Sequence, residues 1–415
     1  MRIVLFTGKG GVGKTTTAAA TAVAAARAGL RTLVLSTDAA HSLGDALGVP
    51  LPDAPATGPV DVEPRLRALH ASAGRTLDPS WRLVQDYLLR VLDSVGVDPV
   101  VADELTALPG ADEVAALLAL HEHAGSGEHD LVVVDCAPTA ETLRLLALPE
   151  ALAWHLERLL PAQRGLLRTL RPAATAAAGV PLPGPEVVET VRGWLQRMRE
   201  VQRLLTGQQA SVRLVTTPER VVVAESRRTW TSLSLYGVAV DGVVVNRLLP
   251  DAQRAARTGG APDPWLAGWN AAQQEGLREV AESFAGVPVT TTPYLAREPV
   301  GPDALAELAA AGGVDPQALL SPVPRHGLAV KRMGEEFVLS LDLPLADRGD
   351  VDLKRRDAEL LVSVGGHRRV LALPAVLTRC TVRGAAVRDG TLRVRFTPTP
   401  GAWPASLAAA GGTRG

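Results

Sequence analysis

Two lysines and two aspartates stand at positions typical of side chains that act together on one ligand. Lys9 and Lys14 lie within a short glycine-rich stretch near the start of the chain. Asp38 and Asp135 each follow an apolar run that reads as a buried strand. Because the carboxyl ends of parallel strands meet at one edge of a sheet, both carboxylates are expected beside whatever the lysines bind. Ammonium groups and carboxylates around a glycine-rich turn favour phosphate chemistry.

The glycine-rich stretch matches the pattern G-x-x-x-x-G-K-[ST] between a predicted strand at Arg2–Thr7 and a predicted helix at Lys14–Arg27. Glycines let the backbone approach phosphate oxygens, and the N–H groups at a helix start attract anions. Lys14 would neutralise the β- and γ-phosphates, and the Thr15 hydroxyl would bind Mg²⁺. ATP and Mg²⁺ are therefore the predicted ligands. The predicted contacts are Gly8, Lys9, Gly10, Gly11, Val12, Gly13, Lys14, Thr15 and Thr16.

The two aspartates are expected to have different roles at the phosphates. Asp38 follows a predicted strand at Arg31–Ser36 and could orient or deprotonate an attacking water, a role worth ~10²–10⁴-fold in rate. It could instead only cap a helix. Asp135 follows a predicted strand at Leu131–Val134, in the position from which an acid holds Mg²⁺ directly or through water. It could also be a buried structural acid. The predicted metal ligands are Thr15, Asp38 and Asp135.

A second group of candidate residues lies later in the chain. Asn246, one of only two asparagines, ends a predicted strand. Its amide offers a donor and an acceptor, which match the edge of adenine, although it could also be a turn asparagine that caps a loop. The loop at Thr292–Gly301 follows another predicted strand and could cover the base, with Pro293 as a contact.

Composition excludes several classes of protein. The 415 residues include 47% hydrophobic residues, enough for a sizeable core and two domains. The net charge of −1 disfavours nucleic acid as a partner. Cys136 and Cys380 are the only cysteines, which excludes a disulfide framework. Without an export signal or an apolar run of ~18 residues, we expect a cytoplasmic protein.

The order of predicted elements indicates an α/β fold of the P-loop NTPase type, with a mainly parallel sheet, followed by an all-β sandwich. We expect the ATPase domain at 1–312, with 43–128 mostly helical. Residues 313–326 are rich in glycine and proline and are predicted to be a linker. The hydrophobic period then changes to two, which predicts a β-sandwich at 327–398 with turns at Gly365-Gly366 and Asp389-Gly390. Its predicted strands are Glu336–Leu343, Ala358–Val364, His367–Leu373 and Thr391–Phe396. Residues 399–415 are predicted to be a disordered tail.

The segment 150–210 differs from the rest of the predicted ATPase domain. It has two apolar faces, at Leu152–Leu170 and Val187–Leu205, separated by the proline-rich stretch Pro172–Pro185. Two amphipathic helices around a flexible lid could form a groove for a hydrophobic client helix. The same faces could instead pack against each other and the sheet, which the sequence alone favours.

Taken together, the motifs resemble those of the ArsA-type ATPases, which include arsenite-pump ATPase subunits and the ATPases that deliver tail-anchored membrane proteins. The likeness covers residues 1–312. It rests on Gly8–Thr16, Asp38–Ser42, Leu108–Glu113, Asp135–Leu145, Pro218–Arg228, Val243–Arg247 and Gln273–Gly301. Residues 327–398 are similar to the small-heat-shock (α-crystallin) domain that some bacterial members append, on Leu373-Pro374 and Asp389–Val394.

The resemblance implies an ATP hydrolase that forms a homodimer around its nucleotides. Lys9 would reach the phosphates across the interface, Asp38 would activate water, and Asn246 would recognise adenine. The 150–210 helices would bind a hydrophobic client, and a membrane protein would be a transient partner.

Four departures from the family pattern keep alternatives open. Ala39 replaces a proline, and Ala140-Glu141 replaces Gly-His, although both catalytic acids remain. The cysteine trio of arsenite sites is absent, and the chain has three methionines, whereas client grooves are rich in methionine. The alternatives are an ATPase subunit for the export of arsenite or another anion, and an ATP-regulated holdase chaperone.

Overall fold

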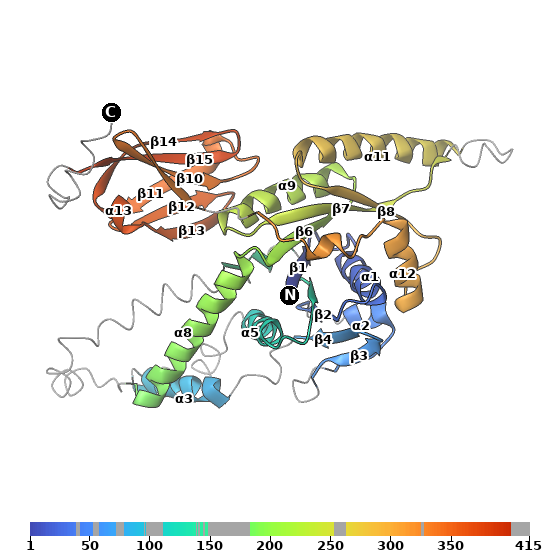
Figure 1. Ribbon diagram of the computed structural model, residues 1–415, viewed down its shortest axis with the longest axis horizontal. Coiled ribbons are helices and arrows are strands. Elements are labelled where there is room, and N and C mark those ends of the chain that lie inside the picture. The colour runs from blue at the N-terminus through green and yellow to red at the C-terminus, as the bar shows by residue number, and fades with distance from the viewer. Residues whose placement is uncertain are drawn as a thin grey trace. The chain divides into compact units, whose positions relative to one another are not determined.

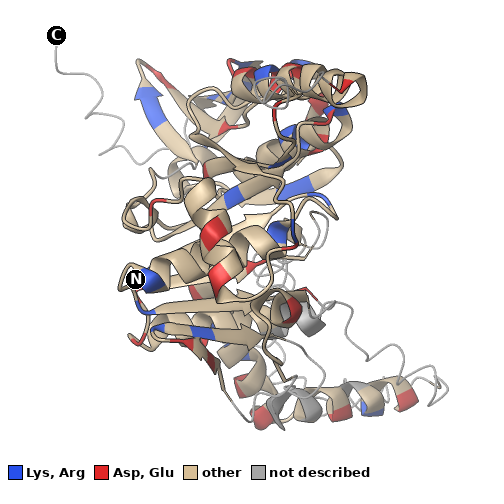
Figure 2. Ribbon diagram, turned by 90° about the vertical axis from the view of Figure 1, so that its right-hand side faces the viewer, with Lys and Arg blue, Asp and Glu red and all other residues tan. Residues whose placement is uncertain are grey.

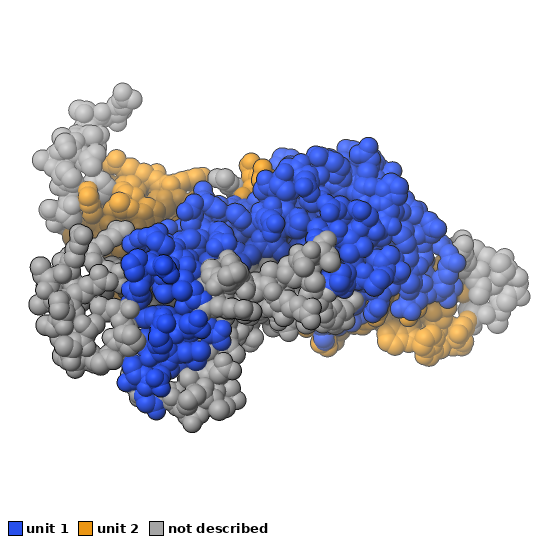
Figure 3. Space-filling model, turned by 90° about the horizontal axis from the view of Figure 1, so that it is seen from below, with its two compact units in different colours: residues 1–205, 295–322 blue, residues 206–294, 323–415 orange. Residues whose placement is uncertain are grey.

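A computed structural model describes most of the protein (Figure 1). The described residues are 1–38, 42–52, 58–71, 79–94, 96, 111–137, 139, 142–143, 146–147, 183–252, 263–324 and 328–399. The chain divides into two compact units (Figure 3). Unit 1 comprises Met1–Leu205 and Leu295–Pro322, and unit 2 comprises Thr206–Tyr294 and Val323–Gly415.

Unit 1 is built on a mainly parallel sheet with the strand order β3-β4-β2-β5-β1. The strands are β1 (Arg2–Thr7), β2 (Thr32–Ser36), β3 (Val60–Glu63), β4 (Leu66–His70) and β5 (Leu131–Asp135). β3 runs antiparallel to β4, and the other pairs in this part are parallel. Every residue of β1, β2 and β5 is buried, as expected for parallel strands covered on both faces. The predicted α/β class is confirmed.

The first helix of unit 1 follows the glycine-rich loop directly and packs closely because its inner face is made of alanines. The helices of this unit are α1 (Lys14–Arg27), α2 (Ser42–Leu47), α3 (Pro79–Ser94), α5 (Ala111–Gly125), α8 (Pro185–Leu205) and α12 (Pro302–Ala311), with a 3₁₀ turn η3 (Ala318–Leu320). Arg27, at the end of α1, forms ion pairs with Glu63 at 3.0 Å and with Asp303 of α12 at 2.8 Å. Within the predicted linker, Leu319 is buried.

The prediction that 43–128 is mostly helical was wrong for β3 and β4. In β4, Leu66, Ala68 and His70 are buried, whereas Arg67 and Leu69 are partly exposed. This alternation is the signature of a strand with one covered face. An alternation of apolar and polar residues over only four or five positions is a weak indication of a strand. The sequence analysis therefore did not predict β3 and β4.

Helix α8 is the part of the 150–210 segment that the structure describes from residue 183 onward. Its buried apolar residues are Val187, Leu195, Met198, Val201 and Leu205. The helix contacts α3 and α5, and Val187 forms a small core with Val84, against which Tyr87 and Trp194 pack. Most apolar residues of this helix are therefore buried, but they pack on α3 and α5, whereas the packed alternative predicted packing on the sheet. The other predicted face, Leu152–Leu170, lies outside the described residues.

Unit 2 begins with three parallel strands in the order β6-β7-β8. They are β6 (Ala210–Thr216), β7 (Val240–Leu248) and β8 (Val289–Pro293), accompanied by helices α9 (Arg220–Leu235) and α11 (Pro264–Ser283). Gly276 of α11 lies so close to Pro218 that an added methyl group would overlap the Pro218 carbonyl. Glycine at this position allows α11 to approach the start of α9.

The rest of unit 2 is the predicted β-sandwich. One sheet has the order β14-β15-β10-β9, and the other has the order β11-β12-β13. The strands are β9 (Ala329–Met333), β10 (Glu336–Asp342), β11 (Val351–Arg356), β12 (Glu359–Val364), β13 (His367–Ala372), β14 (Cys380–Arg388) and β15 (Thr391–Pro398), with short helices η4 (Arg348–Asp350) and α13 (Ala375–Thr378). Hairpin turns lie at Gly365-Gly366 and Asp389-Gly390, where all four residues have positive φ.

The sandwich shares its hydrophobic core with helix α9. Leu235, the last residue of α9, is fully buried within the cluster that fills the sandwich. Arg369 Nη1 donates to the Leu235 carbonyl oxygen at 2.7 Å, and the Thr231 hydroxyl donates to the Pro344 carbonyl oxygen at 2.5 Å. The sandwich is therefore attached to this helix by apolar and polar contacts together.

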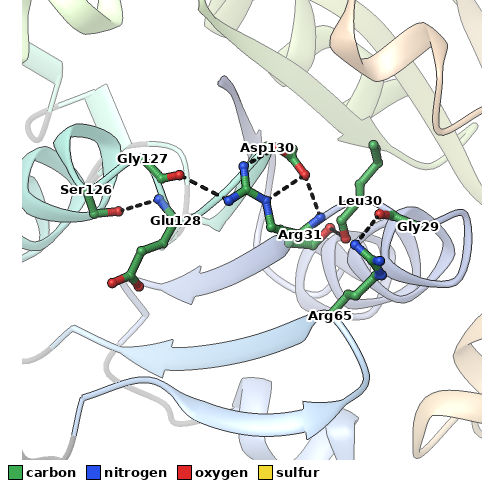
Figure 4. A network of polar contacts seen from close by, with 9 residues as sticks. Gly29, Leu30, Arg31, Arg65, Ser126, Gly127, Glu128 and Asp130 are labelled. Atoms are coloured by element: carbon green, nitrogen blue, oxygen red, sulfur yellow. Dashed lines mark hydrogen bonds and ion pairs between the residues drawn. The ribbon is translucent and has the colours of Figure 1, made fainter.

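Charged residues of both signs are interspersed along the described chain (Figure 2). One network lies at the amino ends of β2 and β5, opposite the strand ends that carry the aspartates (Figure 4). There, Arg31 Nη2 pairs with Asp130 Oδ1 at 2.6 Å, and Arg65 donates to the Gly29 carbonyl oxygen. Within the described residues, none of the helices is both long and apolar enough to cross a membrane.

Candidate functional site

The loop between β1 and α1 has the geometry of a phosphate cradle. Gly11 and Gly13 have φ values of 84° and 87°, a region that favours glycine. A methyl group added at Gly10 or Gly11 would meet no atom within 4 Å, so the space beside the loop is open. Helix α1 begins after Gly13, which has no side chain to cap the first N–H groups. These groups are available to an anion.

The lysines and the first threonine of this segment are buried or half-buried. Lys14 is 6% exposed, and Thr15 is half-buried with its hydroxyl 3.2 Å from the Ser42 hydroxyl of α2. Lys9 is half-buried within the loop. The start of α1 thus carries a buried ammonium and a hydroxyl that is paired with one from α2.

Asp135, at the end of β5, is completely buried. Burial raises the pKa of its carboxyl to about 6; the Thr15 hydroxyl and the Lys14 ammonium oppose this rise, and the Asp38 charge adds to it. The Ser36 hydroxyl donates to Oδ2 at 3.2 Å. Oδ1 has no hydrogen-bond partner within the described part of the chain. The carboxylate is therefore poised to accept a cation.

Asp38 lies just beyond the end of β2 and is half-buried. Its backbone N–H donates to the Ser36 hydroxyl at 3.2 Å, and its carbonyl oxygen lies 2.9 Å from His70 Nε2. Thr37 links the ends of β2 and β5, because its N–H donates to the Asp135 carbonyl oxygen at 2.9 Å. The ends of three neighbouring strands are thus joined around the two aspartates.

The structure brings Lys14, Thr15, Asp38 and Asp135 into one electrostatic group in unit 1. In the following segment, Thr139 is buried, and the Thr142 hydroxyl donates to the Ala137 carbonyl oxygen at 2.7 Å. Ala39, His41, Pro138 and Ala140-Glu141 lie outside the described residues.

Sequence reasoning missed two side chains of this site. Ser36 is the polar last residue of an apolar strand, and His70 ends β4. The signal for Ser36 was present in the sequence, since a hydroxyl that follows three apolar residues lies at the end of a predicted strand. His70 could be recognised as a strand-end residue only if β4 had been predicted.

The candidate base contacts lie in unit 2. Asn246 is inside β7, which ends three residues beyond the predicted end at Val245, and is buried. Its Oδ1 accepts from the Arg247 N–H at 2.9 Å and from the Thr292 hydroxyl at 2.6 Å. Because the Arg247 N–H can only donate, it requires the amide oxygen and thereby fixes the orientation of the amide. Pro293 ends β8 and is half-buried.

Helix α11 holds the chain that follows Asn246. Gln273 Oε1 accepts from the Leu249 N–H at 2.8 Å, and Asn270 Oδ1 accepts from the Ala252 N–H at 2.7 Å. Asn270 also donates to the Pro250 carbonyl oxygen at 3.1 Å. These amides, which sequence reasoning did not assign, fix the turn after β7.

The residues present fit a magnesium ion better than a metal held entirely by protein. No group of three or more histidine, cysteine and acidic side chains that could hold a metal occurs in the described residues. Mg²⁺ is usually held by one or two carboxylates together with substrate phosphates and water. Asp135 Oδ1 and the Thr15 hydroxyl are oxygen ligands of this kind.

Comparisons with known proteins agree with the motifs. A family model described as an anion-transporting ATPase, ArsA_ATPase, matches residues 1–311, and a model described as an HSP20-like domain found in ArsA matches residues 334–396. An uncharacterized protein of Streptomyces coelicolor is 42% identical over 97% of this chain and 99% of its own length. A Chlorobaculum tepidum protein, provisionally named an arsenical pump-driving ATPase, is 35% identical over 95% of this chain and 96% of its own.

A plant relative matches a shorter part of the chain. ATPase GET3B of Arabidopsis thaliana is 33% identical over 59% of this chain and 63% of its own length. The family models and the full-length relatives together cover both the nucleotide-site motifs and the sandwich. The chain therefore belongs to the ArsA family of ATPases and carries the HSP20-like domain found in that family.

Proposed function

We propose that the protein is a Mg²⁺-dependent ATP hydrolase that works as a nucleotide-driven homodimeric switch. The observation that carries this proposal is Asp135, a fully buried carboxylate whose Oδ1 lacks a hydrogen-bond partner in the described residues. Burial of a carboxylate oxygen without a hydrogen-bond partner is costly, so this position favours a bound cation. Mg²⁺ held by Asp135 and Thr15 would supply that cation and neutralise charge on the phosphates.

The chain's own residues would then perform hydrolysis. The loop N–H groups and Lys14 would hold the β- and γ-phosphates, and Asp38 would orient the water. A new bond forms between the water oxygen and the γ-phosphorus, the bond to the bridging oxygen of ADP breaks, and the water proton passes to Asp38. Lys9 would contact the nucleotide bound by the partner subunit, which would make closure of the dimer depend on ATP.

In this proposal Asn246 would recognise adenine through the donor of its amide and not through the acceptor. Its carbonyl oxygen already accepts two hydrogen bonds, from Arg247 and Thr292. Any hydrogen bond from Asn246 to a base is then one that Asn246 donates, so a ring nitrogen of adenine is the expected acceptor. Pro293, beyond Thr292, would contact the base through its ring.

Release of phosphate by the purified full chain tests the proposal. We expect hydrolysis of ATP with Mg²⁺, none with excess EDTA, and a sedimenting species of twice the protomer mass when Mg²⁺ and ATP are present. Phosphate release no faster than in buffer would refute the hydrolase. Hydrolysis by a species that remains monomeric would refute only the dimeric switch.

The proposed client is a hydrophobic helix of the kind found in membrane proteins, bound when ATP reshapes an apolar surface. Because most apolar residues of α8 pack within the chain, α8 in the described arrangement offers little surface for a client. The client surface would therefore involve residues 150–182 or a movement of α8. Crosslinking of a single apolar helix to the full chain should depend on ATP. Equal crosslinking with and without nucleotide would oppose a switch.

Export of arsenite or another anion is a second candidate, favoured by the names of the family model and of several relatives. Arsenite is bound by thiolates, but Cys136 and Cys380 are both buried. Burial raises the pKa of both thiols, which disfavours the thiolate form. Stimulation of ATP hydrolysis by arsenite would support this candidate, and an unchanged rate would oppose it.

A holdase activity is a third candidate, favoured by apolar side chains exposed on the edge strands of the sandwich. Met333 of β9 is 65% exposed and Val382 of β14 is 40% exposed. Removing the sandwich would uncover Leu235, so a surface variant is a cleaner test than a deletion. If the sandwich holds unfolded proteins, Met333→Glu with Val382→Glu should reduce suppression of aggregation while leaving ATP hydrolysis unchanged.

A further inference from the structure

We infer that Ser36 and His70 are positioning residues for hydrolysis, because together they hold both backbone groups of Asp38. The inference rests on the proposed function, in which Asp38 activates the attacking water. Neither residue would touch the nucleotide. Each would act through the position of Asp38, and Ser36 would also act through Asp135.

The sheet register places these residues in one row. Ser36 of β2 is paired with His70 of β4 on one side and with Asp135 of β5 on the other. All three are the last residues of their strands and all are buried. The row therefore places three polar side chains at the carboxyl ends of three neighbouring strands, next to Asp38 in β2's continuation.

The backbone of Asp38 leaves the sheet at this row. The N–H and carbonyl groups of Asp38 bond to side chains: the Ser36 hydroxyl accepts from the N–H, and His70 Nε2 donates to the carbonyl oxygen. Because a carbonyl oxygen can only accept, His70 Nε2 must carry a proton. Two side-chain contacts of this kind fix the peptide units on both sides of the Asp38 Cα atom.

Ser36 also connects the two aspartates. A hydroxyl has one donor and two acceptor sites, and Ser36 donates to Asp135 Oδ2 while it accepts from the Asp38 N–H. A shift of the Asp135 side chain would therefore change the hydrogen bonds of the Asp38 backbone. The general base and the proposed metal ligand are coupled through a single oxygen atom.

Catalytic rates are sensitive to small displacements of a general base. A misplacement of about 1 Å can reduce a rate by ~10²-fold, and a group held by one of its two contacts is displaced only part of the time. We therefore expect His70→Ala to lower kcat by about 10-fold and to leave the Kd for Mg²⁺·ATP within about 2-fold. Ser36→Ala should have a larger effect, because it removes the link to Asp135 as well.

The test compares His70→Ala with His70→Gln in the full chain. The glutamine amide can donate to the Asp38 carbonyl oxygen, so we expect His70→Gln to recover most of kcat, and Ser36→Thr to recover most of the loss in Ser36→Ala. His129→Ala is the matched control, since His129 is also buried but precedes the opposite end of β5. It should leave kcat unchanged. A wild-type kcat in His70→Ala, or a kcat in His70→Gln as low as in His70→Ala, would overturn the inference.

A second measurement separates this inference from the proposed function. Hydrogen exchange of the backbone around Asp38 should be faster in His70→Ala than in wild type and restored in His70→Gln, at equal melting temperature. This readout requires no hydrolysis. If the wild-type protein does not hydrolyse ATP, the proposed function fails; equal exchange in wild type and His70→Ala would overturn the positioning role itself.

Discussion

The polar sites of the two units lie at the carboxyl ends of parallel strands but are built from opposite kinds of group. In unit 1, Lys14, Asp38 and Asp135 bring three ionisable side chains together around a loop with positive-φ glycines. In unit 2, Asn246 and Thr292 form a neutral pair. The first site is left incomplete by the described protein groups, because Asp135 Oδ1 lacks a partner among them. In the second, the acceptor of Asn246 is already used.

This difference indicates how each site would select its ligand. A site built from charged side chains gains most of its affinity from charged ligand groups, here phosphates and a divalent cation. A site whose amide is fixed by neighbours discriminates by the direction of the amide N–H groups, because a wrong base leaves polar groups unpaired. We therefore expect changes in unit 1 to alter affinity and rate, and changes around Asn246 to alter the choice of base.

The largest effect is expected at Lys14. Lys14→Ala should weaken ATP binding by about 10²-fold or more, because it removes a charge-assisted hydrogen bond from a largely buried site. Calorimetric titration with Mg²⁺·ATP measures the loss. Lys331→Ala is the matched control, since Lys331 lies on the exposed edge strand β9. Similar affinities for the two variants would remove the basis for treating unit 1 as the phosphate site.

The next largest effect is expected on the stability of α11, the helix that holds the turn after Asn246. Gly276→Ala places a methyl group on the Pro218 carbonyl and should lower the free energy of unfolding by about 2–3 kcal/mol. Gly268→Ala on the same helix meets no atom within 4 Å and should raise it by about 0.5–1 kcal/mol through helix propensity. Urea unfolding of both variants measures this contrast. Equal stability would show that α11 does not need the close approach.

A smaller effect is expected on the choice of base. Asn246→Asp replaces the amide donor by an acceptor and should reduce the preference for ATP over GTP by about 10-fold. Thr292→Val should give an intermediate result, because it removes one of the two bonds that orient the amide. Competition between the nucleotides measures the preference. Binding of inorganic triphosphate is the control and should not change; an equal loss for all three ligands would contradict a role in base selection.

The smallest effect is expected on the free energy of unfolding, from the Arg31–Asp130 ion pair at the amino ends of β2 and β5. The hydrogen bond from Arg31 lowers the pKa of Asp130 to about 2 from 3.8. A lowered carboxyl pKa stabilises the folded state above pH 3.8, and this stabilisation is lost as the pH falls towards 2. Because the pair is partly exposed, Asp130→Asn should cost less than ~1 kcal/mol at pH 7. A difference in unfolding free energy that grows on acidification would contradict this.

The glycine-rich loop and the two strand-end aspartates could be predicted because their signals are local. Gly8–Thr16 combines conformational freedom with a charged residue at a fixed spacing, and an apolar run before Asp38 or Asp135 indicates where a strand ends. The row His70, Ser36 and Asp135 could not be predicted, because it depends on the register between three strands. Register is set by packing that is distant in the sequence.

In the sandwich, too, features set by neighbouring residues could be predicted, whereas features set by contacts between distant residues could not. Its hairpins at Gly365-Gly366 and Asp389-Gly390 could be predicted, because positive φ at both turn positions requires such residues. Strands β9, β11 and β14 were missed, since they are mostly exposed or charged and lack a strong apolar period. The contact of Arg369 with the end of α9 joins residues 134 positions apart in the sequence, and no local pattern indicates it.

The role of Asp38 is the central claim, and one variant tests it most directly. Asp38→Asn preserves the shape of the side chain but removes the base, so Mg²⁺·ATP should bind with unchanged affinity while turnover falls by ~10²-fold or more. Single-turnover hydrolysis, with the Kd measured on the same sample, gives both values. Turnover by Asp38→Asn at the wild-type rate would contradict the account.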